Sequence, residues 1–292
     1  MIDLVSFLGD PLGHAFFVRA ILAGALVGTV CAVVGTYVVL KGLAFIGDAV
    51  SHAAFPGVVA AFILGGSYLV GAAIAAVATA LGIGYVTRRA RIRADTAIGV
   101  LFAGTFAFGI YLFSTIHAYV GDLFSYLFGY LLAIGVGDLV ALAALSAIVL
   151  AIVALLWKEL LYSTFDPLGA AASGLPVDAL EYLFLGLIAL TIVISLQAVG
   201  IILVVAMLVT PAATAQLLTV RFAALMGLAI AIGIGSAVAG LYLSYWLDVA
   251  SGATIVLVET GVFLLALGLG PRTGLLSRRR RAAAIELMAS AG

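Results

Sequence analysis

The chain contains few charged residues, one cysteine and three histidines. Only 9% of its 292 residues are charged, whereas about a quarter are charged in a soluble globular domain. Because Cys31 is the only cysteine, neither an intrachain disulfide nor a thiol-rich metal site can form. Acidic and basic residues balance at 13 each, so no net charge attracts nucleic acid. The composition therefore excludes an ordinary soluble domain and a disulfide scaffold, and it does not support long-range attraction to nucleic acid.

Motifs for nucleotide hydrolysis and nucleophilic catalysis are missing as well. The sequence has no Gly-Lys dipeptide, so it lacks the Gly-x-x-x-x-Gly-Lys loop that holds nucleotide phosphates. His14 and His117 lie near the ends of apolar segments, where an interfacial role is favoured over a ligand role. The sequence therefore offers no Ser/His/Asp arrangement for nucleophilic catalysis. We therefore expect that the chain is not an enzyme.

Apolar residues make up 66% of the chain and recur in long segments. Segments of about 20 such residues are typical of proteins that cross a membrane several times as helices. The sequence predicts an all-α, polytopic bundle of eight or nine transmembrane helices, with residues 1–292 forming a single domain. We expect these helices at 15–40, 54–66, 68–87, 96–116, 138–157, 181–197, 200–217, 222–246 and 252–270.

Two of the predicted helices have unusual features. The helix at 54–66 is too short to cross a hydrocarbon core of about 30 Å. With residues 42–53 it predicts a broken or re-entrant element, which must be surrounded by protein or a cavity. The helix at 15–40 carries a stripe of small residues that predicts close packing inside the bundle, namely Gly24, Gly28, Ala32 and Thr36.

Basic residues predict the orientation. If the N-terminus lies outside and nine segments alternate, twelve of the thirteen basic residues fall on one side. The positive-inside rule makes that side the cytoplasm of a multi-pass protein in the cell (inner or cytoplasmic) membrane. A basic cytoplasmic tail follows at about 271–292. Its run Arg278–Arg281 is read as a stop-transfer anchor, with a nucleic-acid or lipid patch as the alternative.

One acid and one imidazole interrupt the apolar segments near residue 50. Asp48 and His52 are four residues apart, so on a helix they share a face. Ionisable residues at membrane depth usually face a protein interior or a substrate path. The functional interpretation is a metal site. The structural alternative is that Asp48 caps the turn at 49–55 and His52 satisfies nearby backbone groups.

As a metal site, the pair suits manganese, zinc or ferrous iron and disfavours cuprous copper, because it joins a carboxylate oxygen to an imidazole nitrogen. Two ligands are too few to hold such an ion. A two-fold homodimer would bring a second copy of the pair to the axis and complete four ligands. The transported ion would then be the only metal, with no permanently bound cofactor.

Other polar residues are open to more than one interpretation. Glu259, inside the last helix, either lines the pathway or forms a buried hydrogen bond, and the second is favoured. Asp122 and Asp138 bracket an aromatic loop at 117–137, which is either a belt at the membrane surface or a resting place for a delivering protein. In 158–180, Asp166 and Pro167 predict the start of a short helix that serves as a connector or a docking surface.

Three stretches resemble the membrane permeases of zinc/manganese/iron-type ABC importers. They are 43–57 (LAFIGDAVSHAAFPG), 165–174 (FDPLGAAASG) and 200–215 (GIILVVAMLVTPAATA). The second resembles that family's coupling helix, here expected at about 165–175. The resemblance implies that this helix docks on the ATPase through Phe165, Asp166, Ala170 and Gly174. Gly169 departs from the family's usual bulkier or polar residue, and Glu259 stands where an apolar residue is expected.

The resemblance also implies partners and a function. It implies a homodimeric or heterodimeric permease, for which we expect a second copy of this chain. It also implies two cytoplasmic ATPase subunits that bind and hydrolyse the ATP, and an extracytoplasmic metal-binding protein. We therefore expect the permease of an importer that carries a divalent transition metal past Asp48 and His52. The alternatives are a permease for a metal chelate such as a siderophore or cobalamin, and an ion-gradient carrier or channel without ATPase partners.

Overall fold

The computed structural model describes residues 9–116 and 131–269, and within these ranges it contains helices and no strands. Within the described ranges, eight helices are long and apolar enough to cross a membrane. They are α2 (Ala15–Leu40), α3 (Ile46–Leu64), α4 (Tyr68–Ala90), α5 (Ala94–Ser114), α7 (Val136–Leu155), the first part of α10 (Val177–Leu218), α11 (Phe222–Leu247) and α12 (Ser251–Leu269). The predicted all-α membrane bundle is confirmed.

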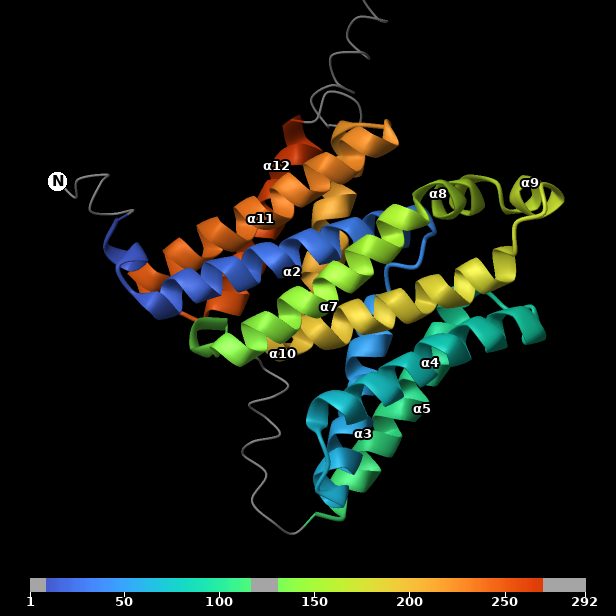
Figure 1. Ribbon diagram of the computed structural model, residues 1–292, viewed down its shortest axis with the longest axis horizontal. Helices are drawn as coiled ribbons and strands as arrows, with labels where there is room; N and C mark the ends of the chain where they lie inside the picture. Colours follow the sequence, from blue (N-terminus) through green and yellow to red (C-terminus); the bar gives the residue numbers. More distant parts are fainter. Residues whose placement is uncertain (1–8, 117–130, 270–292) are drawn as a thin grey trace, which may run out of the picture.

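Helix α10 is the centre of the bundle. It contacts α2, α3, α4, α7, α11 and α12. Figure 1 shows α3, α4 and α5 together on one side of α10, with α2, α7, α11 and α12 on the other. In the described part of the chain, helix α5 makes its main contacts with α3 and α4. These three helices therefore form one unit. Two short helices, α8 (Trp157–Phe165) and α9 (Pro167–Ala172), lead from α7 to α10, and a 3-10 turn, η1 (Leu131–Ala133), precedes α7.

The predicted break before residue 54 is wrong. Helix α3 runs without interruption from Ile46 to Leu64 and contains Pro56. A membrane helix can hold a proline, because neighbouring helices compensate for the lost hydrogen bond. The break in the backbone lies instead in α10, where Gly200 has φ 79° and ψ 170°. A positive φ is accessible to glycine at little cost, and the turn separates the first half of α10 from a shorter apolar helix at Leu203–Leu218.

Close helix packing depends on glycine at the contacts. A Cβ added to Gly35 of α2 would collide with the carbonyl oxygen of Leu208 in α10, and one added to Gly57 of α3 would collide with that of Gly71 in α4. In the predicted stripe, a Cβ added to Gly28 would lie 3.0 Å from the backbone of Gly233 in α11. Small residues let helices meet this closely in lipid, and the predicted inner place of the first helix is confirmed.

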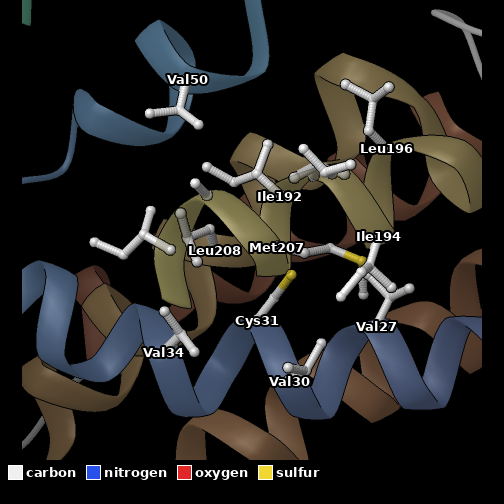
Figure 2. Packing of buried hydrophobic residues seen from close by; sticks show 14 of the residues in the cluster. Val27, Val30, Cys31, Val34, Val50, Ile192, Ile194, Leu196, Met207 and Leu208 are labelled. Atoms are coloured by element: carbon white, nitrogen blue, oxygen red, sulfur yellow. The ribbon is translucent and has the colours of Figure 1, made fainter. Parts of the chain in front are cut away.

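The core lies between α2 and α10. Figure 2 shows Val27, Val30, Cys31 and Val34 of α2 facing Ile192, Ile194, Met207 and Leu208 from both halves of α10. Cys31 is fully buried, and its Sγ lies 3.6 Å from Ser195 Oγ. It acts as a small buried residue, as the sequence predicts. Because side chains of both α10 halves pack on α2, the break at Gly200 is held in place.

Candidate metal site

Asp48 and His52 lie in the first turns of α3. The helix follows a tight turn at Gly42, whose φ is 69°. Asp48 is the acidic residue of its first turn, where the unpaired N–H groups of a helix favour negative charge. Pro56 has no N–H, so the carbonyl of His52 lacks the donor that normally follows four residues later. The start of α3 is therefore polar although its surroundings are apolar.

The two side chains meet on one face, as their spacing predicts. His52 Nδ1 lies 3.3 Å from Asp48 Oδ1 and 2.9 Å from the Asp48 carbonyl oxygen. Because a carbonyl oxygen only accepts, Nδ1 is the donor in this contact, and the tautomer with its proton on Nδ1 has the lone pair on Nε2. The His52 side chain is 27% exposed and that of Asp48 is 47% exposed. Both are thus accessible from outside this chain.

An aromatic wall holds the imidazole. Phe102 and Phe106 of α5 stack on each other and meet the His52 ring edge to face at centroid distances of 5.3 and 5.5 Å. These contacts fix the plane of the ring. Sequence reasoning missed both phenylalanines. Their spacing of four residues on a predicted helix was the available signal, but it does not say which helix they face.

The pair can supply part of a metal shell. A carboxylate oxygen and a lone-pair nitrogen are ligands for manganese, iron or zinc. In residues 9–116 and 131–269, no three His, Cys, Asp or Glu side chains gather closely enough to hold an ion. Within these residues, Asp48 and His52 therefore form at most half of a four-ligand shell. Of the structural alternative, the Asp48 cap is not formed, since α3 has no side-chain cap. The local backbone role is formed, because His52 Nδ1 and Ser51 Oγ both bond to the Asp48 carbonyl.

The predicted coupling helix is shorter than 165–175. Phe165 ends α8, and α9 spans only Pro167–Ala172, because the extended backbone of Asp166 (φ −141°, ψ 80°) separates the two. Asp166 Oδ1 accepts from Gly169 N at 2.8 Å, which confirms the predicted N-cap ahead of Pro167. Ala170 is buried, and Gly174 ends the segment with φ 89°.

The glycine at 169 has a local cause. A Cβ there would collide with the Asp166 carboxylate and lie 2.9 Å from the Tyr162 hydroxyl. Glycine thus lets the N-cap close. Around it, Phe165 and Leu168 are 63% and 85% exposed. Exposed apolar side chains on a short helix are typical of a docking surface.

The remaining polar residues lie apart from this site. Glu259 is 0% exposed, and neither carboxylate oxygen has a hydrogen-bond partner in the part of the chain that the structure describes, so the favoured buried hydrogen bond is not formed there. Asp138 bonds to Gly135 N and to Gln197 Nε2. His14 bonds to the Asp10 carbonyl and lies near Tyr245. His117, Asp122 and the tail 271–292 fall outside the described residues.

Comparison with known proteins shows which family and which relatives the chain resembles. Residues 13–270 match the ABC 3 transport family. The chain is 46% identical over 278 residues to the manganese transport system membrane protein MntC of Halalkalibacterium halodurans, covering 95% of both chains. It is 40% identical over 278 residues to the chelated iron transport system membrane protein YfeC of Yersinia pestis, covering 95% of this chain and 94% of that one.

A solved structure shares the fold. The structure titled PsaBC from Streptococcus pneumoniae in complex with Fab matches with a TM-score of 0.83 and 35% identity. The match covers 94% of this chain and 99% of that chain. The arrangement of helices around α10 is therefore shared with a solved relative over almost the whole length.

Proposed function

This chain belongs to the ABC 3 transport family, and from that premise we propose that it is the permease of an ATP-driven importer for a divalent transition metal, with manganese as the first candidate. The resemblance seen in the three sequence stretches is confirmed by the family match and by relatives named for manganese transport. With eight apolar helices, the chain is a multi-pass protein of the cell membrane.

The observation that carries the proposal is a pair of metal ligands on α3 that supplies only part of a coordination shell. Asp48 and His52 are adjacent, accessible and too few to bind an ion alone. A second permease copy related by a two-fold axis would add the same two ligands and give a four-ligand shell. The shell would hold two negative charges before an ion enters, so it would attract cations. Oxygen and nitrogen ligands suit manganese and ferrous iron.

A shell made of side chains from two copies also suits transport. The ion must leave as well as enter, which a closed structural cage would prevent. Relative movement of the copies separates the ligands and releases the ion. The bundle then alternates between outward-open and inward-open states, biased by nucleotide on one side and by a loaded binding protein on the other.

ATP binding and hydrolysis belong to separate cytoplasmic subunits in this proposal. The docking surface consists of α9 with the exposed apolar residues Phe165 and Leu168, and α9 lies at one end of the bundle (Figure 1). An extracytoplasmic metal-binding protein would deliver the ion at the opposite end. No metal stays bound as a permanent cofactor, since the ion is the cargo.

Uptake of radioactive manganese into cells without their own manganese permease tests the proposal. The variant Asp48→Ala with His52→Ala should lose uptake to background. The matched control is Asp95→Asn, which removes an exposed carboxylate from the first turn of α5 and should keep uptake within about twofold. Normal uptake by the double variant would refute the metal site.

A chelate permease is the second candidate, because two relatives are named for chelated iron transport and the site has an aromatic wall. A chelated ion needs no protein ligands, so uptake would survive the double variant. Competition separates the two: free manganese should block uptake through an ion site, and an iron chelate should block uptake through a chelate site. Purification without any nucleotide-hydrolysing subunit would instead favour a gradient-driven carrier.

A further inference from the structure

An ionic clamp joins the end of α4 to the start of α10. One nitrogen of the Arg88 guanidinium donates to Asp178 Oδ1 and the other to Glu181 Oε2. The guanidinium also lies over the Tyr182 ring, 5.5 Å from its centroid. A planar guanidinium that bridges two carboxylates holds geometry as well as charge. We call these three residues, Arg88, Asp178 and Glu181, the Arg88 clamp.

The clamp lies directly after the proposed docking helix. Between α9 and α10 only residues 173–176 intervene. Their backbone is tied back to α9, because Gly174 N donates to the Ala171 carbonyl and Leu175 N to the Ala170 carbonyl. A displacement of α9 therefore reaches the first turns of α10, which carry both carboxylates. Figure 1 shows α9, the start of α10 and the end of α4 at the same end of the bundle.

From Arg88 the contacts continue to the metal site. One turn before Arg88, Gly84 brings α4 so close to α10 that an added Cβ would lie 2.5 Å from Leu185. Near the N-terminus of α4, the backbone of Gly71 lies directly against the backbone of Gly57 in α3. Helix α3 cannot slide over α4 at such a contact without separating from it. A movement of α4 thus carries α3, and with it Asp48 and His52.

A second set of contacts, made by aromatic rings, joins the docking end to other helices. The Phe222 ring of α11 packs against Phe165, Trp157 and Tyr37, at centroid distances of 6.4, 5.0 and 5.2 Å. This set joins the docking end to α2 and α11, and it does not include α4. In the described part of the chain, the clamp supplies the ion pairs between α10 and the α3–α5 unit.

Lys41 adds a link from the clamp to the loop that enters α3. Its Nζ lies 5.7 Å from the centroid of the Phe184 ring, and Glu181 and Arg88 act on it electrostatically. Burial lowers the pKa of this lysine, and the attraction of Glu181 works against that decrease. The four groups together carry two positive and two negative formal charges, so breaking one pair leaves a charge unbalanced.

We propose that Arg88 is a positioning residue of the importer, which makes the α3–α5 unit follow the docking helix by holding Asp178 and Glu181. The proposal rests on the proposed function, since it assigns a mechanical link between the ATPase and the metal site. When the clamp is intact, movement at α9 shifts α10 and the α3–α5 unit together. When it is broken, movement at α9 shifts Asp48 and His52 less, because in the described residues only apolar packing still joins α10 to the α3–α5 unit, and fewer ions are transported for each ATP hydrolysed.

The test is the number of manganese ions imported per ATP hydrolysed, measured on the complete complex with its ATPase and binding protein in liposomes. Arg88→Gln should lower this ratio by about three- to tenfold. The matched control is Arg89→Gln, which removes an exposed arginine from the same helix end and should leave the ratio unchanged. The exchange Arg88→Glu with Glu181→Arg should recover at least about half of the lost coupling.

Three results would overturn the proposal. One is an unchanged ratio in Arg88→Gln, including the case in which less complex assembles but each complex transports normally. Another is an equal decrease in Arg89→Gln, and the third is an exchange variant that recovers nothing. Failure of the proposed function is a separate result, because the wild-type complex would then import no manganese, or Asp48→Ala with His52→Ala would import it normally.

Discussion

The Asp48–His52 pair of α3 and Glu259 of α12 are ionisable groups within apolar helices, and they differ in their exposure. The Asp48–His52 pair lies on an accessible face, with 47% of the aspartate and 27% of the histidine side chain exposed. Glu259 of α12 is 0% exposed, and its carboxylate has no partner within the described ranges. Both places violate the apolar pattern of a membrane helix. Of these two places, the first combines adjacent metal ligands with side chains that are accessible from outside the chain.

This difference shows that an ionisable residue in a membrane helix is not by itself evidence of a metal site. An ion needs several ligands and a route, and Glu259 offers one carboxyl among packed helices. The cost of burying an unpaired carboxyl is several kcal/mol in its charged form. Glu259 is therefore interpreted as an unexplained polar residue of the core, and the metal role is kept for the α3 pair.

Neutralising each carboxyl in turn tests which of the two residues manganese uptake requires. Asp48→Asn should lower manganese uptake by about 100-fold or more, because loss of one ligand in each copy removes half of the shell. Glu259→Gln should change uptake by less than about twofold. Both substitutions keep side-chain size, so packing is matched. A large loss in Glu259→Gln, with normal uptake in Asp48→Asn, would reverse the roles assigned to the two places.

A smaller effect is expected from the aromatic wall of the site. Phe102→Ala removes one of the two rings that hold His52, and the imidazole then samples more orientations. The apparent affinity for manganese should fall by about three- to tenfold, in line with the loss of an orienting contact around a ligand. Phe108→Ala, on the exposed face of the same helix, is the control. Equal effects of the two variants would argue against an orienting role.

The smallest expected effect concerns stability. Glu259→Leu replaces an unpaired buried carboxyl by an apolar side chain of similar length. The folded state should gain roughly 1–3 kcal/mol, seen as a higher unfolding temperature of the detergent-solubilised protein. Glu259→Gln stays polar and should change that temperature little. A lower unfolding temperature for Glu259→Leu would show that the carboxyl has a stabilising role.

Much of the fold was predictable because helices in lipid must satisfy their own backbone. The prediction of 15–40 matches α2, and the interruption expected between 197 and 200 appears as the break at Gly200. The start of α3 was not predictable from composition. The sequence predicts a helix only from residue 54, yet packing against α4 and α5 accompanies a helix that is continuous from Ile46.

The candidate site was predictable only in its polar part. The spacing of Asp48 and His52 places them on one face, and the structure confirms that contact. Phe102 and Phe106 could not be assigned to it, because a sequence does not show that α5 packs beside α3. The contact of Arg88 with Asp178 and Glu181 joins positions 90 and 93 residues apart, which no local pattern predicts. The partner ligands remain a prediction, since they belong to a second copy.

The most direct test of the metal site is the manganese content of the purified complex, trapped before transport and measured together with the number of permease copies. The account predicts one ion for every two copies, and almost none in Asp48→Asn. A full content in Asp48→Asn, or one ion for each copy, would contradict a site shared by two permeases at Asp48 and His52.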